Sequence, residues 1–160
     1  MRFARVAALG GGIAAFAAGI AFAQVPQYGS NVTIEQARKA IAASAVEARK
    51  NNWPVAIAVV DTAGMLVAFE KMDGTQNGSV MIAQDKAVSA AMLRRPTKVL
   101  QDALAAGGVG VRVLSLRYAI PIEGGVPITV DGKIIGAVGV SGVTSDQDGV
   151  VAGAGVAALK

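Results

Sequence analysis

The pattern of apolar and polar residues is clearest in residues 123–142, EGGVPITVDGKIIGAVGVSG, which predict two paired strands. Asp131-Gly132 is typical of a two-residue hairpin loop, because both residues tolerate the positive φ that a type I′ turn requires. The second strand is apolar on both faces, which predicts a central place in a sheet with a layer packed on each side. Three glycines leave bare backbone along it, where a helix or a ligand can approach closely. The pairs expected across the hairpin are Val130 with Lys133, Ile128 with Ile135, and Val126 with Ala137, and the other face carries Thr129, Ile134, Val138 and Val140.

Four helices are predicted, the first from apolar residues at helical spacing and the others from the residues that begin or end them. Thr33 and Gln36 form a capping box at the start of the first helix. Ser79 and Thr97 are expected to cap the second and third helices, and Pro96 ends the second because the residue before proline avoids the helical region. The predicted helices cover residues 33–50, 80–94 and 97–104, and a last segment that starts at 144–148.

Two further runs predict strands. Residues 54–61 (PVAIAVVD) and 65–71 (MLVAFEK) are expected to form a buried strand and its returning partner. Residues 111–120 are ambiguous, and we expect a loop and a short strand there. The order of elements predicts an α/β (α+β) domain with an antiparallel sheet of about five strands and helices on both faces.

The start of the chain has the features of a secretory signal peptide. Arg2 and Arg5 precede an apolar run, and Ala21-Phe22-Ala23 fits the A-x-A cleavage pattern with Gln24 as the first mature residue. The competing interpretation is an uncleaved membrane anchor, for which the apolar run is short and rich in glycine. The predicted organisation is a signal peptide at 1–23, a linker at 24–32 and one domain at 33–160, in the periplasm or secreted, with no membrane span after cleavage.

Composition removes several kinds of chemistry. The 160 residues include no cysteine and no histidine, which excludes disulfides, thiolate chemistry, the Ser-His-Asp triad and imidazole ligation of zinc or haem. The formal net charge is +4, but Arg2 and Arg5 belong to the leader and the other basic residues are scattered. We therefore expect no binding of nucleic acid.

Charged residues beside helix ends and glycines are the candidates for a binding site. Arg94 and Arg95 lie where a helix ends, either to bond its last carbonyls or to hold a carboxylate by a bidentate contact. Lys86 lies on an Ala-rich helix, either on a solvated face or in a pocket. Glu123, before two glycines, is either a turn residue or a group presented to a ligand.

Two glycine-containing motifs are weaker indications of a functional site. Residues 139–142 (GVSG) superficially resemble a nucleophile elbow, but the G-x-S-x-G pattern and any histidine are missing. Residues 107–110 (GGVG) could cradle an anion through backbone N–H groups, although a helix stop is the simpler interpretation because they follow a helix.

Several blocks in one order, QARKAI, VAIAVVDTAGMLVAFEKMDG, AQDKA, RRPT, EGGVPI, GAVGVSG and TSDQD, together resemble the GlcG/HbpS haem-binding-protein family. That family is related to the C-terminal domain of PduO-type proteins. The resemblance implies a profilin-like fold with a five-stranded antiparallel sheet, homo-oligomers, and binding of haem or a related tetrapyrrole as a small-molecule ligand. The pocket region that it implies consists of Lys86, Arg95, Thr97, Glu123, Gly124 and Gly125.

The leading hypothesis is a small-ligand-binding protein in which Arg95 and Lys86 hold acidic groups of a tetrapyrrole, and the two glycines admit it to the backbone. Without histidine the iron ligand stays open. One alternative is an accessory enzyme of organic-acid metabolism with Glu123 as general base; another is a structural oligomer without ligand. Haem requires an apolar slot with cationic groups at its mouth, and an enzyme requires a carboxyl group with a raised pKa in a closed pocket. Candidate iron ligands are Met65, Met72, Met81, Met92, Tyr118, Lys86, or a threonine or carboxylate oxygen.

Overall fold

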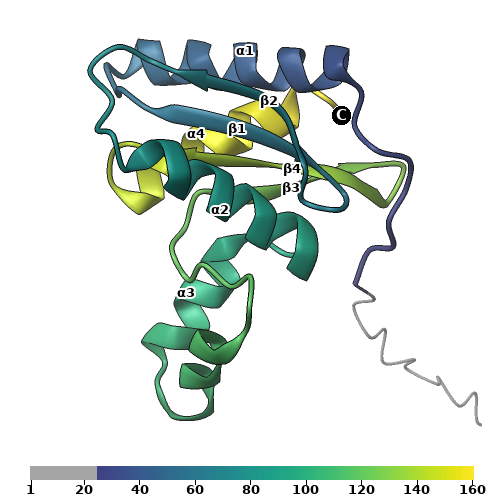
Figure 1. Cartoon of the computed structure of the whole chain (residues 1–160), viewed down its shortest axis with the longest axis vertical. Coiled ribbons are helices and arrows are strands. Elements are labelled where there is room, and N and C mark those ends of the chain that lie inside the picture. The colour runs from purple at the N-terminus through teal and green to yellow at the C-terminus, as the bar shows by residue number, and fades with distance from the viewer. Residues whose placement is uncertain (1–24) are drawn as a thin grey trace, which may run out of the picture.

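The centre of the structure, a computed structural model that describes residues 25–160, is a four-stranded antiparallel sheet (Figure 1). The strands are β1 (Ala56–Asp61), β2 (Leu66–Lys71), β3 (Gly125–Val130) and β4 (Lys133–Ser141). Their order across the sheet is β2-β1-β4-β3. The predicted α/β class is confirmed, with four strands in place of about five. The predicted signal peptide lies outside the described residues.

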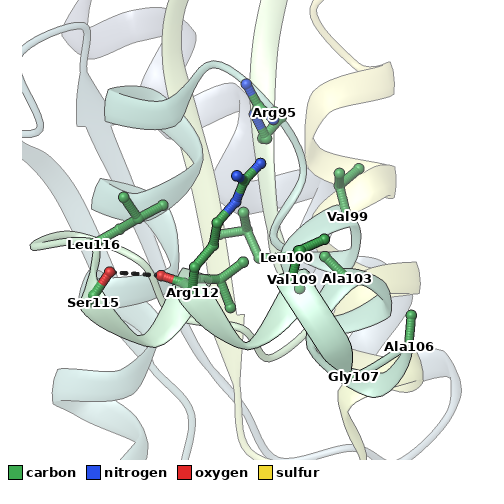
Figure 2. Close-up of a pocket in the computed structure, with 12 residues that line it drawn as sticks. Arg95, Val99, Leu100, Ala103, Ala106, Gly107, Val109, Arg112, Ser115 and Leu116 are labelled. Atoms are coloured by element: carbon green, nitrogen blue, oxygen red, sulfur yellow. Dashed lines mark hydrogen bonds between the residues drawn. The ribbon is translucent and has the colours of Figure 1, made fainter.

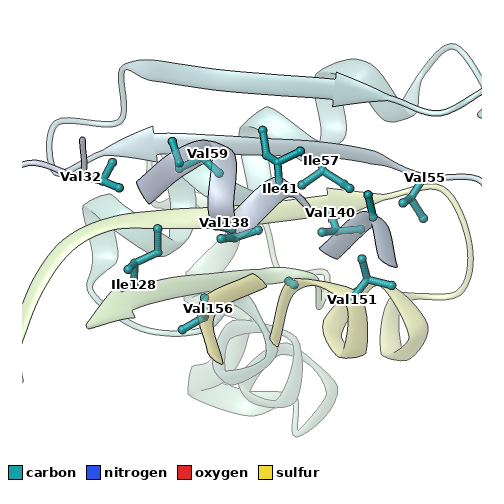
Figure 3. Packing of buried hydrophobic residues seen from close by; sticks show 14 of the residues in the cluster. Val32, Ile41, Val55, Ile57, Val59, Ile128, Val138, Val140, Val151 and Val156 are labelled. Carbon is teal, nitrogen blue, oxygen red and sulfur yellow. The ribbon is translucent and has the colours of Figure 1, made fainter. Parts of the chain in front are cut away.

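One face of the sheet is covered by α1 (Ile34–Lys50) and α4 (Ser145–Ala157). Side chains of the two central strands, such as Ile57 and Val138, point into this layer, where Val151 of α4 meets them (Figure 3). The layer also holds the buried small residues of α1. The capping box predicted at the start of α1 is confirmed, because the side chains of Thr33 and Gln36 each accept a hydrogen bond from the other's backbone N–H.

The opposite face is covered by α2 (Ser79–Leu93), which packs a stripe of alanines on the sheet. A Cβ at Gly139 would overlap the backbone of Ala83 and Ala87, so the helix lies almost directly on the strand. This confirms that bare backbone in β4 admits a helix. Every residue of β4 after Lys133 is buried, as expected for a strand with a layer on both sides.

The hairpin β3–β4 turns at Asp131 (φ 49°) and Gly132 (φ 73°), as predicted, but its register differs from the prediction. A bulge between Ile128 and Thr129 makes Ile128 pair with Gly136, and Val126 with Val138. The bulge adds one residue to β4, and every pair beyond it shifts by one. As a consequence, Val138 and Val140 share the α1–α4 face with Ile128 and Ile135, contrary to the expected alternation.

Two predicted caps are wrong. Ser79 is the first residue of α2, after the N-cap Gly78, and its buried hydroxyl contacts Gln76 Nε2 and Ser141 Oγ. Thr97 likewise lies inside the next helix, after the N-cap Pro96. Both side chains make contacts to other elements in place of the helix's own N–H groups.

A lobe projects from the body of the domain between α2 and β3, and we call residues 97–122 the lobe (Figure 1). It contains α3 (Thr97–Ala105) and the 3₁₀ helix η1 (Gly108–Ser115). The short strand expected at residues 111–120 does not form, because η1 occupies the first part of that segment. This accounts for the lower strand count.

The segment expected to be a linker runs beside β4. The N–H of Gly29 donates to Ile134 O at 2.8 Å, and the N–H of Val32 donates to Ile135 O at 2.7 Å. Within residues 25–160, no helix has the length and the apolar run needed to cross a membrane.

Candidate functional site

An apolar slot of about 500 Å³ lies in the lobe, between α3 and η1 (Figure 2). A turn at Gly107 (φ 68°) brings η1 back against α3, and the left-handed backbone there favours glycine. The residues 107–110, whose alternatives were an anion cradle and a helix stop, end α3 and start η1. The slot is lined by Arg95, Val99, Leu100, Ala103, Ala106, Gly107, Val109, Gly110, Arg112, Val113, Ser115 and Leu116.

Arg95 and Arg112 are the two charged residues among those that line the slot. Arg95 follows the left-handed C-cap Arg94 of α2, and its Nε donates to Leu93 O at 3.0 Å. Arg112 comes from η1, and Figure 2 shows its guanidinium extending toward Arg95. Both residues are exposed, and neither forms an ion pair within residues 25–160. The slot therefore combines apolar walls with two cationic groups that are free to bind an anion.

Lys86 has its own partner inside the protein. Its Nζ donates to Asp148 Oδ2 at 2.8 Å and to Val140 O at 3.0 Å, and the residue is completely buried. The ammonium thus connects α2 with β4 and the first turn of α4. Asp148, expected at the N-terminal end of that helix, is also buried there.

Burial raises the pKa of the Asp148 carboxyl above its usual value of 3.8, and the hydrogen bond and charge of Lys86 oppose the rise. The other oxygen of this carboxylate accepts from the N–H of Val143 at 3.3 Å. Asp148 therefore has a perturbed pKa, but its carboxylate is fully engaged by groups of the protein.

Thr97, Gly124 and Gly125 lie beside this ion pair. The hydroxyl of Thr97 accepts a hydrogen bond from the N–H of Gly125 at 2.9 Å, which ties the start of α3 to the start of β3. A Cβ at Gly125 would overlap Lys86 O, and a Cβ at Gly124 would lie 2.8 Å from Lys86 Nζ. The close approach at these glycines is made by α2. Their predicted contact with a ligand stays a prediction.

Glu123 is half-buried at the end of the lobe. Its N–H donates to Gln101 Oε1 at 2.8 Å, and its side chain lies against Gly149, where a Cβ would come within 2.9 Å of Glu123 Cγ. It does not line the slot.

The structure divides the predicted site residues into two groups. Lys86, Thr97, Gly124 and Gly125 form a buried junction, with Glu123 at its edge, whereas Arg95 faces the slot. Sequence reasoning missed Arg112, which lies in the segment whose structure was ambiguous. The sequence did contain one signal for it, since Arg112 and Arg117 are the charged residues of a stretch, 103–122, that has no acid.

The candidate iron ligands are dispersed. Met65, Met81 and Tyr118 are exposed on other parts of the surface, and Met72 packs against the α1–α4 layer. Neither these residues nor Met92 nor Lys86 line the slot. Among residues 25–160 there is no cluster of three or more acidic side chains that could hold a metal ion.

A four-stranded antiparallel sheet with helices on both faces defines a profilin-like α+β domain, and comparisons with known proteins specify the family. The family model described as "Haem degrading protein HbpS-like" matches residues 32–157. The chain belongs to this HbpS-like family.

Individual relatives agree with this assignment. Protein GlcG of Escherichia coli K12 is 46% identical over 107 residues, which are 67% of this chain and 78% of GlcG. The structure is similar to that of an HbpS double mutant from Streptomyces reticuli, with a TM-score of 0.75, 29% identity and 99% of each chain covered. It is also similar to PduOC in its complex with heme, with a TM-score of 0.72 over 80% of this chain and 94% of PduOC, where 24% identity supports the fold alone.

Proposed function

We propose that this protein binds haem or a related tetrapyrrole in the slot between α3 and η1. The observation that carries the proposal is the apolar slot with two guanidinium groups among its lining residues, neither of which forms an ion pair with any other part of residues 25–160. Its volume, about 500 Å³, falls within the range of small-ligand sites. The description of the matching family model, "Haem degrading protein HbpS-like", supports haem as the ligand.

The chemistry of the slot matches the two parts of such a ligand. Aliphatic side chains such as Val109 and Leu116 would cover the faces of the macrocycle, which is favourable because apolar surface leaves water on both partners. Arg95 and Arg112 would hold the propionate groups, since a guanidinium binds a carboxylate through two parallel hydrogen bonds. A bound haem would supply iron, and the two arginines would orient the haem by the edge that carries its propionates.

The buried junction would position one of these arginines. Thr97 holds the first turn of α3 through the N–H of Gly125, and Arg95 lies two residues before it. The ion pair between Lys86 and Asp148 fixes the helix from which Arg95 emerges. In this proposal the junction residues support the slot from inside the body of the domain.

Haem titration followed by absorption tests the proposal. Arg95→Ala and Arg112→Ala should each weaken binding by about tenfold or more, because each removes a charge-assisted contact worth about 1.5–3 kcal/mol. Arg95→Lys should recover part of the loss, since an ammonium cannot reproduce the planar fork. Arg117→Ala is the matched control, because Arg117 belongs to the lobe and packs over the ring of Tyr118 outside the slot. Absence of haem binding by the wild type at micromolar concentration would overturn the proposal.

An enzyme of organic-acid metabolism has less support. No carboxylate of the described part of the chain lines the slot. Asp148 has a carboxyl group with a raised pKa, but Lys86 and the N–H of Val143 occupy both of its oxygens. Glu123, the predicted base, is in contact with Gly149.

Location and assembly complete the proposal. The protein is proposed to lie in the periplasm or to be secreted, and the A-x-A pattern at residues 21–23 supports this export. Large apolar residues that are exposed on the lobe outside the slot, among them Leu114 at 62% and Ile122 at 45%, support a homo-oligomer of the kind implied by the family resemblance. Light scattering on the purified protein measures the assembly, and a monomer at micromolar concentration would exclude it.

A further inference from the structure

Among residues 25–160, none of the side chains that usually hold haem iron lines the slot. Those side chains are histidine, cysteine, methionine and tyrosine. The whole sequence has no histidine and no cysteine, and no methionine, tyrosine, lysine or acidic residue is among those that line the slot. The polar side chains that do line it are Arg95, Arg112 and Ser115.

None of these three side chains is suited to bind the metal. A guanidinium stays protonated and has no lone pair to offer. The hydroxyl of Ser115 donates to the backbone oxygen of Arg112 at 2.8 Å, so it serves to hold the end of η1 (Figure 2). The site therefore fits the macrocycle and its carboxylates and does not fit the iron.

Candidate ligands elsewhere in the described chain do not reach the slot. Met65 lies in the turn between β1 and β2 and is 65% exposed, and Met81 lies on α2 and is 62% exposed. Lys86 is bound to Asp148 inside the body of the domain. An iron ligand from residues 25–160 of the same protomer would thus have to come from a rearrangement that breaks the buried pair or moves another element.

We propose that the slot recognises a tetrapyrrole by its apolar faces and its carboxylates alone, so that metal-free porphyrins bind as well as haem. This inference rests on the proposed function. It specifies the ligands of the slot as tetrapyrroles with two carboxylates, whether or not they carry a metal. The terms that favour binding, burial of the macrocycle and pairing of carboxylates with guanidinium groups, are the same with and without iron.

The test compares the binding of four probes to the same purified protein, measured by absorption and porphyrin emission. The probes are ferric protoporphyrin IX, its zinc form, metal-free protoporphyrin IX, and the dimethyl ester of the metal-free compound. Dissociation constants of the first three should agree within about fivefold, while the ester, which lacks both charges, should bind at least about tenfold more weakly. Arg112→Ala should weaken ferric and metal-free protoporphyrin by the same factor, and Arg117→Ala should change neither.

The possible results separate the inference from the proposed function. If no probe binds, the proposed function fails, and the inference fails with it. If the ferric form binds more than about fivefold more tightly than the metal-free form, a group of the protein ligates the iron, and the inference fails while the proposed function stands. An ester that binds as tightly as the free acid would also overturn the inference, because the two arginines would then have no part in recognition.

Discussion

The ammonium of Lys86 lies 2.8 Å from the Oδ2 atom of Asp148, and only 1% and 3% of the two side chains remain exposed. The two residues come from α2 and α4, helices that cover opposite faces of the sheet. Their ion pair therefore connects the two layers past the end of β4. A buried pair of this kind is sensitive to the loss of either charge, because the remaining one has no water around it.

Loss of the cation alone should be costly. We expect Lys86→Met to lower the free energy of unfolding at neutral pH by about 3–5 kcal/mol, since it leaves the Asp148 carboxylate buried and unpaired. Urea denaturation of both proteins measures the change. The double variant Lys86→Met/Asp148→Leu should recover much of the loss, because both charges are then gone. Lys98→Met is the control, since Lys98 and Asp102 form an exposed pair and little change is expected.

Stability should depend on the ionisation of Asp148. Its pKa in the folded protein is raised above 3.8, mainly by burial, so between 3.8 and the folded pKa the folded state binds more protons than the unfolded state. The contribution of this group to stability is therefore fully present below pH 3.8 and is lost as the pH rises through the folded pKa. Asp148→Asn should remove this slope in denaturation curves measured across the acidic range. An identical slope in the variant would mean that Asp148 is not the titrating group.

Close packing of the central strand gives a third prediction. A Cβ at Gly136 would overlap Val60 O and would approach Val32 Cγ1 at 3.1 Å, so Gly136→Val should destabilise the protein by about 1–3 kcal/mol. Gly153 of α4 is the matched control, because nothing lies within 4 Å of a Cβ placed there. Gly153→Ala should stabilise by about 0.5–1 kcal/mol, since alanine favours the helix. An unchanged midpoint for Gly136→Val would contradict the two-sided burial of β4.

Processing at the start of the chain is a fourth prediction. From the A-x-A pattern at residues 21–23, the mature protein is expected to begin at Gln24 and to lie outside the cytoplasm. Intact-mass measurement on protein from the native host tests both points. Material that retains Met1 would refute cleavage.

Local signals in the sequence predicted local structure well. The loop Asp131-Gly132 and the capping box of Thr33 and Gln36 are both present, because each depends on residues within a few positions of one another. The predicted register of the hairpin was wrong because of the bulge at Ile128. Both faces of β4 are apolar, so the alternation of apolar residues does not reveal a shift by one residue.

The site shows the same limit at longer range. The partner of Lys86 is 62 positions away in the sequence, and Asp148 fitted the simpler role of an acidic residue at a helix start. Arg95 was recognised because it stands beside Pro96, a strong helix stop. Arg112 was missed because its place in the slot depends on how η1 folds back on α3. The spacing of apolar residues does not predict that fold-back.

The hydrogen bond from the N–H of Gly125 to Thr97 has a consequence for how this architecture can vary. It fastens together the two points at which the lobe leaves and rejoins the body of the domain. A segment whose ends are held at one place can change in length at small entropic cost, and the strands on either side keep their register. The lobe can therefore change in length, shape and bound ligand during evolution while the sheet and the helices that cover it stay the same.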